Sequence, residues 1–332
     1  MSATPRLTYY DTVCGFAILL VVLGHCIQSL SMGWQENSLE LVIYSFHMPL
    51  FMIISGKFFL PSVNKVSCVE YLKNRFVRLV IPSLTWGVFN VLLISAGKMM
   101  KHNMLQPLEA LNIVCIGMWF LTVLFLLSAA GALIENYLSR LRYLAWGIIW
   151  LLLYVSPIFW MRNEMLFLLP YFVGAIACSQ LQWDKCPWWV GVVSFAVFAV
   201  CVHHYTFNDT MYEMMAFDNT THYHLQSLFR FVTGLSGSVT ILSLLRYANR
   251  LKHVNSWLVS IGTLTLPIYV LHQKFFIPTL IHPVDINIFI IIAMTPVLIL
   301  LSIAVYRILR KSSILALMLF GEARSNQPCC QR

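Results

Sequence analysis

The chain has 332 residues, of which 59% are hydrophobic and only 11% are charged, and its mean hydropathy is +0.75. A soluble domain usually carries about a quarter of charged residues, so this composition excludes that class and predicts a polytopic membrane protein. The formal net charge is +9, with 22 Lys and Arg against 13 Asp and Glu. We interpret this excess as a topology signal and an attraction to the inner leaflet of the lipid bilayer, with no support for nucleic-acid binding.

Ten apolar runs are candidates for transmembrane helices, which need about 17 to 25 mostly apolar residues each. Their expected bounds are 12–30, 39–59, 78–97, 108–134, 143–160, 165–180, 188–203, 225–245, 257–280 and 286–308. The sixth and seventh runs are short, so we expect them to be tilted, packed inside the bundle or partly re-entrant. The sequence therefore predicts an all-α, integral membrane bundle of about ten helices.

Basic residues alternate between successive loops, as the positive-inside rule requires. If both termini are cytoplasmic, 17 of the 22 Lys and Arg residues fall on the cytoplasmic side. No connection between the runs reaches the ~50 residues of a typical domain, so one membrane domain, 1–332, with a cytoplasmic tail at 309–332, accounts for the chain. Residues 67–78 are polar and basic with apolar residues at helical spacing, which predicts an interfacial amphipathic helix.

The cysteines and the first apolar run suggest no further function. Nine cysteines are scattered, mostly in apolar runs, without CxxC spacing, so we expect neither a disulfide framework nor a zinc site. The run 12–30 lacks a small-residue cleavage pattern and is followed by further spans. We interpret it as a retained helix rather than a secretory signal.

Polar residues within the apolar runs are the candidate site, because ionisable groups at membrane depth usually face a cavity and mark function. A rise of 1.5 Å per residue places His25 about 19 Å and His47 about 18 Å above the cytoplasmic end of the spans. Arg230 and His272 fall at about 22 Å, and Trp119 at about 14 Å. These similar depths predict one site, although depth alone does not bring side chains together.

Each of these residues also has a purely structural interpretation. A single intramembrane histidine is as often a hydrogen-bonded packing residue as a functional one, and Trp119 by itself favours packing. Arg75 and Arg78 are ordinary positive-inside anchors in one interpretation. In the other, such basic residues beside the bilayer bind a polyanion such as the phosphates of coenzyme A.

Several ordered motifs resemble the membrane-bound acyltransferase-3 family. The first helix of that family typically reads Asp, two residues, Arg-Gly, an apolar run and then His, and here Asp11 and Gly15 precede Gly24-His25. The further matches are Phe46-His47-Met48-Pro49-Leu50-Phe51 with Ile54-Ser55-Gly56; Arg75 and Arg78 with Leu79 and Pro82; Met118-Trp119-Phe120-Leu121; Leu266-Pro267-Ile268-Tyr269 with Leu271-His272; and the ending 311–321. Their order across nearly the whole chain makes the resemblance specific.

The resemblance implies that the protein is a multi-pass O-acyltransferase of the cell membrane, in bacteria the inner membrane. Such an enzyme moves an acyl group, commonly acetyl, from cytoplasmic acyl-CoA to a hydroxyl of a sugar, polysaccharide or lipid-linked glycan, often at the outer face. Acyl-CoA is then a co-substrate, with no bound cofactor or metal. His25 matches the family's essential histidine, and His47, Arg75, Arg78, Trp119 and His272 match positions that recur in the family.

One position departs from the family pattern. The family usually has Arg, sometimes Lys, eleven residues before the histidine, where this chain has Cys14. Eleven residues make three turns plus about 20°, so Cys14 shares a helix face with His25 at a distance of about 16.5 Å. We expect Arg75 or Arg78 to compensate at the cytoplasmic mouth and Arg230 to stabilise charge near His25. A catalytically impaired family member is the alternative.

Esterifying a hydroxyl needs a base and a positive group for the developing oxyanion. We assign His25 as the general base, with a covalent acyl-histidine as the less favoured variant. His47 or His272 would orient it or bind the acceptor, and Arg230 is a candidate oxyanion or acceptor contact. The rival function is a transporter or flippase, which an inverted internal repeat would favour, and the sequence contains no such symmetry. A membrane sensor is the third alternative.

Overall fold

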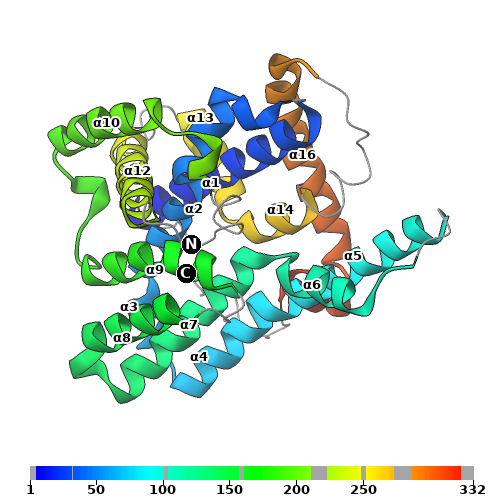
Figure 1. The fold of residues 1–332 in the computed structure, drawn as a ribbon, viewed down its shortest axis with the longest axis horizontal. Coiled ribbons are helices and arrows are strands. Elements are labelled where there is room, and N and C mark those ends of the chain that lie inside the picture. The colour runs from blue at the N-terminus through cyan, green and yellow to red at the C-terminus, as the bar shows by residue number, and fades with distance from the viewer. Residues whose placement is uncertain are drawn as a thin grey trace. The chain divides into compact units, whose positions relative to one another are not determined.

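The computed structural model describes residues 5–31, 33–100, 104–156, 161–210, 223–247, 252–272 and 286–322. Within these ranges the regular structure is entirely helical, with no β-strand, which confirms the predicted all-α class (Figure 1). The chain forms two compact units, which we describe separately. Unit 1 comprises 1–58 and 166–303, and unit 2 comprises 59–165 and 304–332.

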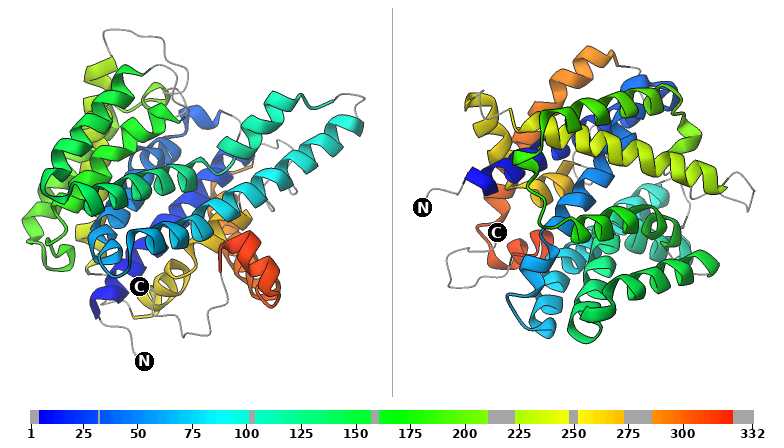
Figure 2. Two further views of the ribbon diagram at one scale, coloured as in Figure 1. Left: turned by 90° about the horizontal axis from the view of Figure 1, so that it is seen from below. Right: turned by 90° about the vertical axis from the view of Figure 1, so that its left-hand side faces the viewer.

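Unit 1 contains the helices that carry His25, His47, Arg230 and His272. Its elements are α1 (Pro5–Leu30), η1 (Trp34–Glu36), α2 (Ser38–Lys57), most of α9 (Arg162–Ala177), η4 (Trp183–Lys185), α10 (Trp188–His203), η5 (Phe207–Asp209), α12 (Tyr223–Leu245), α13 (Lys252–Gly262), α14 (Thr265–Leu271) and most of α16 (Ile288–Leu309). Helix α1 packs against α2, α12, α13 and α14, and α10 packs along α12 (Figure 2). Helix α1 is therefore the central helix of this unit.

Helices α1 and α13 approach closely because glycines lie at their contact. A Cβ added to Gly15 would overlap the carbonyl oxygen of Leu258, and one added to Gly262 would overlap that of Asp11. The hydroxyl of Thr12 also donates to Oδ1 of Asn255 at 2.7 Å. Small residues of this kind let helix backbones touch within a membrane bundle.

The predicted span 257–280 is a broken helix where the structure describes it. Helix α13 ends at Gly262, and α14 begins at Thr265 with a bend of 71° between them. The break follows a glycine, which weakens a helix, and Pro267 falls in the first turn of α14, where its missing N–H costs nothing. Residues 273–280 of this predicted span lie outside the described ranges.

Unit 2 carries Arg75, Arg78 and Trp119. Its elements are α3 (Phe59–Val63), α4 (Cys68–Arg75), the π-helical turn η2 (Phe76–Val80), α5 (Ile81–Met100), α6 (Pro107–Ile116), α7 (Trp119–Tyr137), η3 (Ser139–Leu141), α8 (Arg142–Val155), the ends of α9 and α16, and α17 (Ser313–Phe320). Ser67 caps α4 by accepting from the N–H of Glu70. Helices α5 and α6 pack side by side (Figure 2).

The structure extends one predicted helix of this unit and contradicts another. The expected helix 67–78 is present as α4 and the start of η2, and it continues into α5 as one helix over Cys68–Met99, while its interfacial location stays a prediction. The expected single span 108–134 is two helices, since the backbone of Met118 leaves the helical region at φ −127° and ψ 48°. Gly117 precedes this break, and α6 packs closely on Gly87 of α5, where a Cβ would lie 2.7 Å from Val114 Cα.

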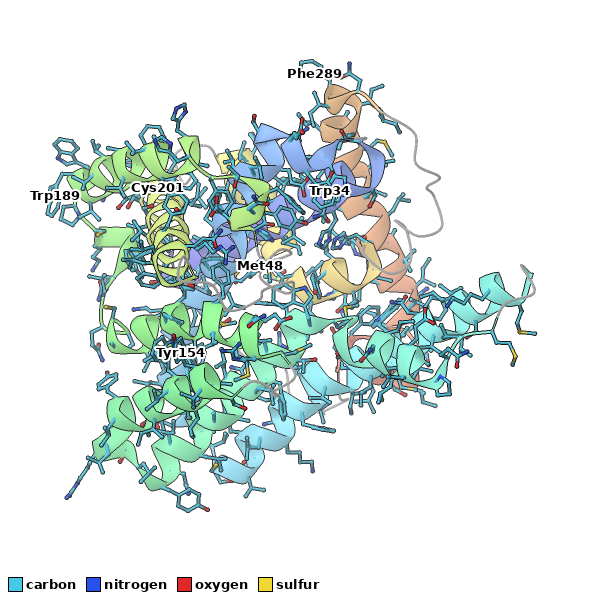
Figure 3. All side chains as sticks on the ribbon, in the orientation of Figure 1. Trp34, Met48, Tyr154, Trp189, Cys201 and Phe289 are labelled. Atoms are coloured by element: carbon cyan, nitrogen blue, oxygen red, sulfur yellow. The ribbon has the colours of Figure 1, made fainter. Side chains whose placement is uncertain are left out.

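The described residues contain six helices long and apolar enough to cross a membrane, or seven if α13 and α14 count as one bent span. The six are Thr8–Leu30, Ser38–Lys57, Cys68–Met99, Trp119–Tyr137, Leu225–Leu245 and Ile288–Leu309. Helix α10 is apolar but shorter, with 16 residues. In Figure 3, Met48 lies within unit 1, whereas Trp189 and Phe289 project outward, and the last two are 56% and 77% exposed. Such exposed apolar side chains fit a lipid-facing surface, and the count of ten spans stays a prediction.

Candidate functional site

His25 and His272 are in direct contact in unit 1, although 247 positions separate them in the sequence. Nδ1 of His25 lies 2.9 Å from Nε2 of His272, and the two rings stack with centroids 5.2 Å apart. Helix α1 supplies the first residue, and the end of α14 supplies the second. His272 is fully buried and His25 is half-buried. The sequence predicted a shared depth for these histidines, and the structure brings them together.

The hydrogen bonds of the pair define which nitrogens carry protons when both rings are neutral. Nδ1 of His272 lies 2.7 Å from the carbonyl oxygen of Ile268, one turn earlier. A carbonyl only accepts, so Nδ1 of His272 is the donor and its Nε2 carries the lone pair. His25 must then donate from Nδ1 to His272. The lone pair of His25 is therefore on Nε2, which is the atom suited to remove a proton.

His47 has the same local arrangement as His272, and its described hydrogen bond and ring contact are both with residues of its own helix, α2. Its Nδ1 donates to the carbonyl of Ile43 at 2.8 Å, and its ring packs edge-on against Tyr44 at 4.7 Å. The side chain is 3% exposed. The bond to Ile43 leaves the lone pair of a neutral His47 on Nε2. Its role beside His25 stays a prediction.

Arg230 is buried in α12 and binds the segment that precedes this helix. Its Nη2 donates to the carbonyl of Asn208 at 2.5 Å, and Gln226 donates to the same carbonyl at 3.1 Å. Gln226 also donates to Oδ1 of Asp209, whose Oδ2 accepts from the backbone and hydroxyl of Thr206. The described contacts of Arg230 therefore hold η5 on the start of α12. Its predicted action on an oxyanion near His25 stays a prediction.

Tyr205 completes this polar cluster next to η5. Its hydroxyl donates to the carbonyl of Asp209 at 2.8 Å, and its ring packs near Phe229. Burial raises the pKa of Tyr205 well above its usual range, although the nearby Arg230 guanidinium opposes this change. The phenol therefore stays protonated and keeps its donor role at physiological pH.

Asp11 and Cys14 lie near the start of α1, on the part of the helix that packs against α13. The backbone carbonyl of Asp11 faces Gly262, and Cys14 is half-buried. The backbone of Asp11 thus takes part in the contact that aligns α1 with α13. The structure keeps Cys14 on the same helix as His25, as the sequence predicted.

Arg75 immediately precedes the π-helical turn of unit 2, and Arg78 lies within it. The Nε of Arg75 donates to the hydroxyl of Tyr71 at 3.0 Å, and its guanidinium lies over the Tyr71 ring at 5.1 Å. Arg75 is half-buried, whereas Arg78 is exposed. Two guanidinium groups on one turn are able to bind phosphate oxygens, so this is the candidate site for acyl-CoA.

Trp119 begins α7 in unit 2. It is half-buried, and its ring meets Phe120 edge-on at 5.8 Å. This contact fits the packing interpretation given above. Its predicted role as an acceptor or transition-state contact is not tested by this geometry.

The sequence interpretation missed residues that position the histidine pair. Gly15 and Gly262 set the α1–α13 contact, and the carbonyl of Ile268 fixes the proton of His272. Glycines within two apolar runs were an available signal, because small residues mark helix contacts in membranes. The role of Ile268 had no signal, since a backbone carbonyl belongs to every residue. In the described part of the chain, no group of three or more His, Cys, Asp or Glu could hold a metal ion.

Two curated relatives match part of this chain. The nodulation protein NolL of Sinorhizobium fredii (strain NBRC 101917 / NGR234) is 40% identical over 88 residues, which cover 25% of this chain and 24% of that protein. The nodulation protein NolL of Mesorhizobium japonicum is 31% identical over 123 residues, which cover 35% of this chain and 33% of that protein. The matches thus span a quarter to a third of the relatives' length.

No solved structure matches the chain. A family model described as an acyltransferase domain matches residues 7–307, which include every motif from Asp11 to His272. This match covers nearly the whole chain, and it confirms the resemblance that the ordered motifs indicated. The chain therefore belongs to the acyltransferase-3 family.

Proposed function

We propose that this protein is an integral membrane O-acyltransferase that moves an acyl group, with acetyl the first candidate, from acyl-CoA to a hydroxyl of a sugar, polysaccharide or lipid-linked glycan. The observation that carries the proposal is the hydrogen bond between His25 and His272 in a chain of this family. This bond presents Nε2 of His25 as a base.

In the proposed reaction, Nε2 of His25 takes the proton of the acceptor hydroxyl while that oxygen attacks the thioester carbonyl carbon. The C–S bond breaks, and the thiolate of coenzyme A takes the proton from His25. The products are an ester and free coenzyme A. His272 accepts from Nδ1 of His25 throughout, so it stabilises the imidazolium that forms and holds the ring in place.

Arg75 and Arg78 are the proposed contacts for the phosphates of acyl-CoA. Their position on one helical turn supports this assignment, and it supplies a cationic site in a chain that has Cys14 where the family usually has Arg. His47 and Trp119 are proposed acceptor contacts, and Arg230 is a proposed contact for the acceptor or the oxyanion.

We further propose a bacterial inner-membrane location with about ten spans, both termini and the donor site on the cytoplasmic side, and the acceptor reached from the outer side. The alternation of basic residues along the chain supports this topology. Both relatives are named nodulation proteins, but each aligns with only part of this chain, so neither identifies its acceptor.

The test uses the purified full-length protein in lipid nanodiscs with acetyl-CoA labelled in the acetyl group and a panel of glycans. We expect wild-type protein to release coenzyme A and label an acceptor, and His25→Ala to lower the rate by about 100- to 10,000-fold, because a general base is lost. His203→Ala is the matched control, since His203 is an exposed histidine at the end of α10. Equal rates in His25→Ala and wild type would contradict the assignment.

The same preparation separates the rival functions. Movement of a glycan or lipid across the bilayer without consumption of acetyl-CoA supports a transporter or flippase. Neither movement nor consumption supports a catalytically impaired family member or a sensor. Either result, obtained with a folded and donor-exposed protein, would replace the enzyme proposal.

A further inference from the structure

The end of the C-terminal helix α17 touches the π-helical turn that carries Arg78. Gly321 follows α17 with a left-handed backbone, at φ 65° and ψ 27°. A Cβ added there would lie 2.5 Å from the carbonyl oxygen of Val77 and 2.6 Å from Cα of Arg78. Real Cβ contacts are longer than this, so the two backbones are as close as a glycine permits.

Helix α17 is firmly attached to unit 2. Nε1 of Trp86 on α5 donates to the carbonyl of Leu319 at 3.0 Å. The buried ring of Phe320 meets Tyr306 edge-on at 4.9 Å, and the hydroxyl of Tyr306 donates to Glu322 at 2.5 Å. These contacts lie on both sides of Gly321, so the position of its backbone is fixed by the surrounding structure.

The π-helical turn is the part of this helix that needs such support. In an α-helix, three residues turn through 300°, so Arg75 and Arg78 would lie about 60° apart. The wider winding of η2, between Phe76 and Val80, changes that angle and the direction of Arg78. Single π turns are rare in α-helices overall, but those that occur are often at functional sites. Because the ordinary α-helix is the favoured winding, packing must stabilise this turn.

We propose that α17 is a positioning element of the donor site and that Gly321 is a positioning residue, which acts through the π-helical turn on Arg78. The proposal rests on the function assigned above to Arg78. It gives the C-terminal helix a role in acyl-CoA affinity in addition to ordinary packing. A purely local role for Gly321, as the left-handed end of a helix, is the alternative to be separated.

Gly33 is the matched control for that alternative. It also has a left-handed backbone, at φ 71°, but a Cβ added to Gly33 would meet no atom within 4 Å. Gly33→Ala therefore measures the conformational cost of alanine alone, whereas Gly321→Ala adds the displacement of Val77 and Arg78.

The experiment measures acetyl-CoA kinetics and coenzyme A binding for the full-length protein in nanodiscs. For Gly321→Ala we expect KM to rise about three- to tenfold and kcat to change less than about twofold, because donor binding is weakened without loss of the base. Gly33→Ala should leave KM unchanged. In the double variant with Arg78→Ala, the two KM effects should not multiply, since both act through Arg78.

Two results would overturn the inference. In the first, Gly321→Ala leaves KM unchanged although Arg78→Ala raises it. In the second, the fold-change of KM in the double variant equals the product of the two single fold-changes. An unchanged KM in Arg78→Ala instead contradicts the proposed donor site itself. If Gly321→Ala does not fold, Trp86→Phe replaces it, because this change removes the hydrogen bond to Leu319 and part of a buried ring, keeps an aromatic side chain there, and should raise KM about twofold with kcat retained.

Discussion

His47 and His272, both buried, share a hydrogen-bond pattern at the level of single residues. In each, Nδ1 donates to the carbonyl four positions earlier, which belongs to Ile43 or Ile268. The bond fixes the ring on its own helix and directs the lone pair of Nε2 away from it. The difference lies in the neighbour, because His272 directs Nε2 at His25. This makes His272 the residue that orients the proposed base.

Replacing His272 tests this orienting role. We expect His272→Ala to lower kcat about 10- to 1,000-fold, because His25 loses the acceptor for its Nδ1 proton. His272→Gln should retain more activity than His272→Ala, since an amide oxygen is able to accept that hydrogen bond. The measurement is kcat with labelled acetyl-CoA between pH 6 and 9.

The double variant His25→Ala with His272→Ala provides the control for this prediction. Residues that act as a unit give effects that do not add, so it should be no slower than His25→Ala alone. A further large loss would show that His272 acts independently of His25. Equal activity of His272→Ala and wild type would remove His272 from the mechanism.

The sequence identified the histidines as candidate site residues but did not predict which two of them are in contact. His25, His47 and His272 stood out because charged or polar rings are rare in apolar runs, and helical rise placed them at similar depth. Which two meet depends on how α1 and α14 are rotated and bent. Those angles follow from tertiary packing, which a single sequence does not encode in any local pattern.

Among the elements, the contact between α1 and α13 aligns both helices that supply the pair. Helix α1 carries His25, and α13 leads through the 71° bend into α14 and His272. Gly15 and Gly262 are the points where a larger side chain has no room. The geometry of the site therefore depends on two glycines at the contact between α1 and α13.

Alanine at Gly262 should accordingly destabilise unit 1. We expect Gly262→Ala to lower the free energy of unfolding by about 1 to 3 kcal/mol or more, because its Cβ overlaps the Asp11 carbonyl. Gly174→Ala on α9 is the control, where a Cβ meets nothing within 4 Å and the helix should gain up to about 1 kcal/mol. Thermal unfolding in detergent measures both. A Gly262→Ala protein as stable as Gly174→Ala would contradict the packing.

Helix positions were well predicted where an apolar run is bounded by polar residues. The expected runs 12–30, 39–59, 225–245 and 286–308 correspond closely to α1, α2, α12 and α16. The run 108–134 was wrong as one helix because the break at Met118 lies inside uninterrupted apolar sequence, where hydropathy carries no boundary. Local backbone geometry, set by packing of α6 on α5, decided that boundary instead.

For the whole molecule, three short helices decide the topology. Between α7 and α12 the described residues form the α-helices α8, α9 and α10, with 14, 16 and 16 residues. At 1.5 Å per residue these are about 21 to 24 Å long, less than the hydrocarbon core of about 30 Å. If all three cross, the chain passes from one side of the membrane to the other between Ser139 and Asn208. If none crosses, these two residues lie on the same side.

The distribution of basic residues favours three crossings. Arg140 and Arg142 lie at the start of α8, as expected on the cytoplasmic side, whereas 204–224, after α10, contains no Lys or Arg. In a variant without native cysteines, we expect a membrane-impermeant maleimide to label Asn208→Cys from outside and Ser139→Cys only after lysis. Asn208 is suited to the test because its described bonds use the backbone carbonyl, which cysteine keeps. Gln35→Cys in η1 before α2 and Asn64→Cys after α3 are the outside and inside controls. Labelling of both Ser139→Cys and Asn208→Cys only after lysis would exclude three crossings and place η5 on the cytoplasmic face, away from an acceptor that arrives from outside.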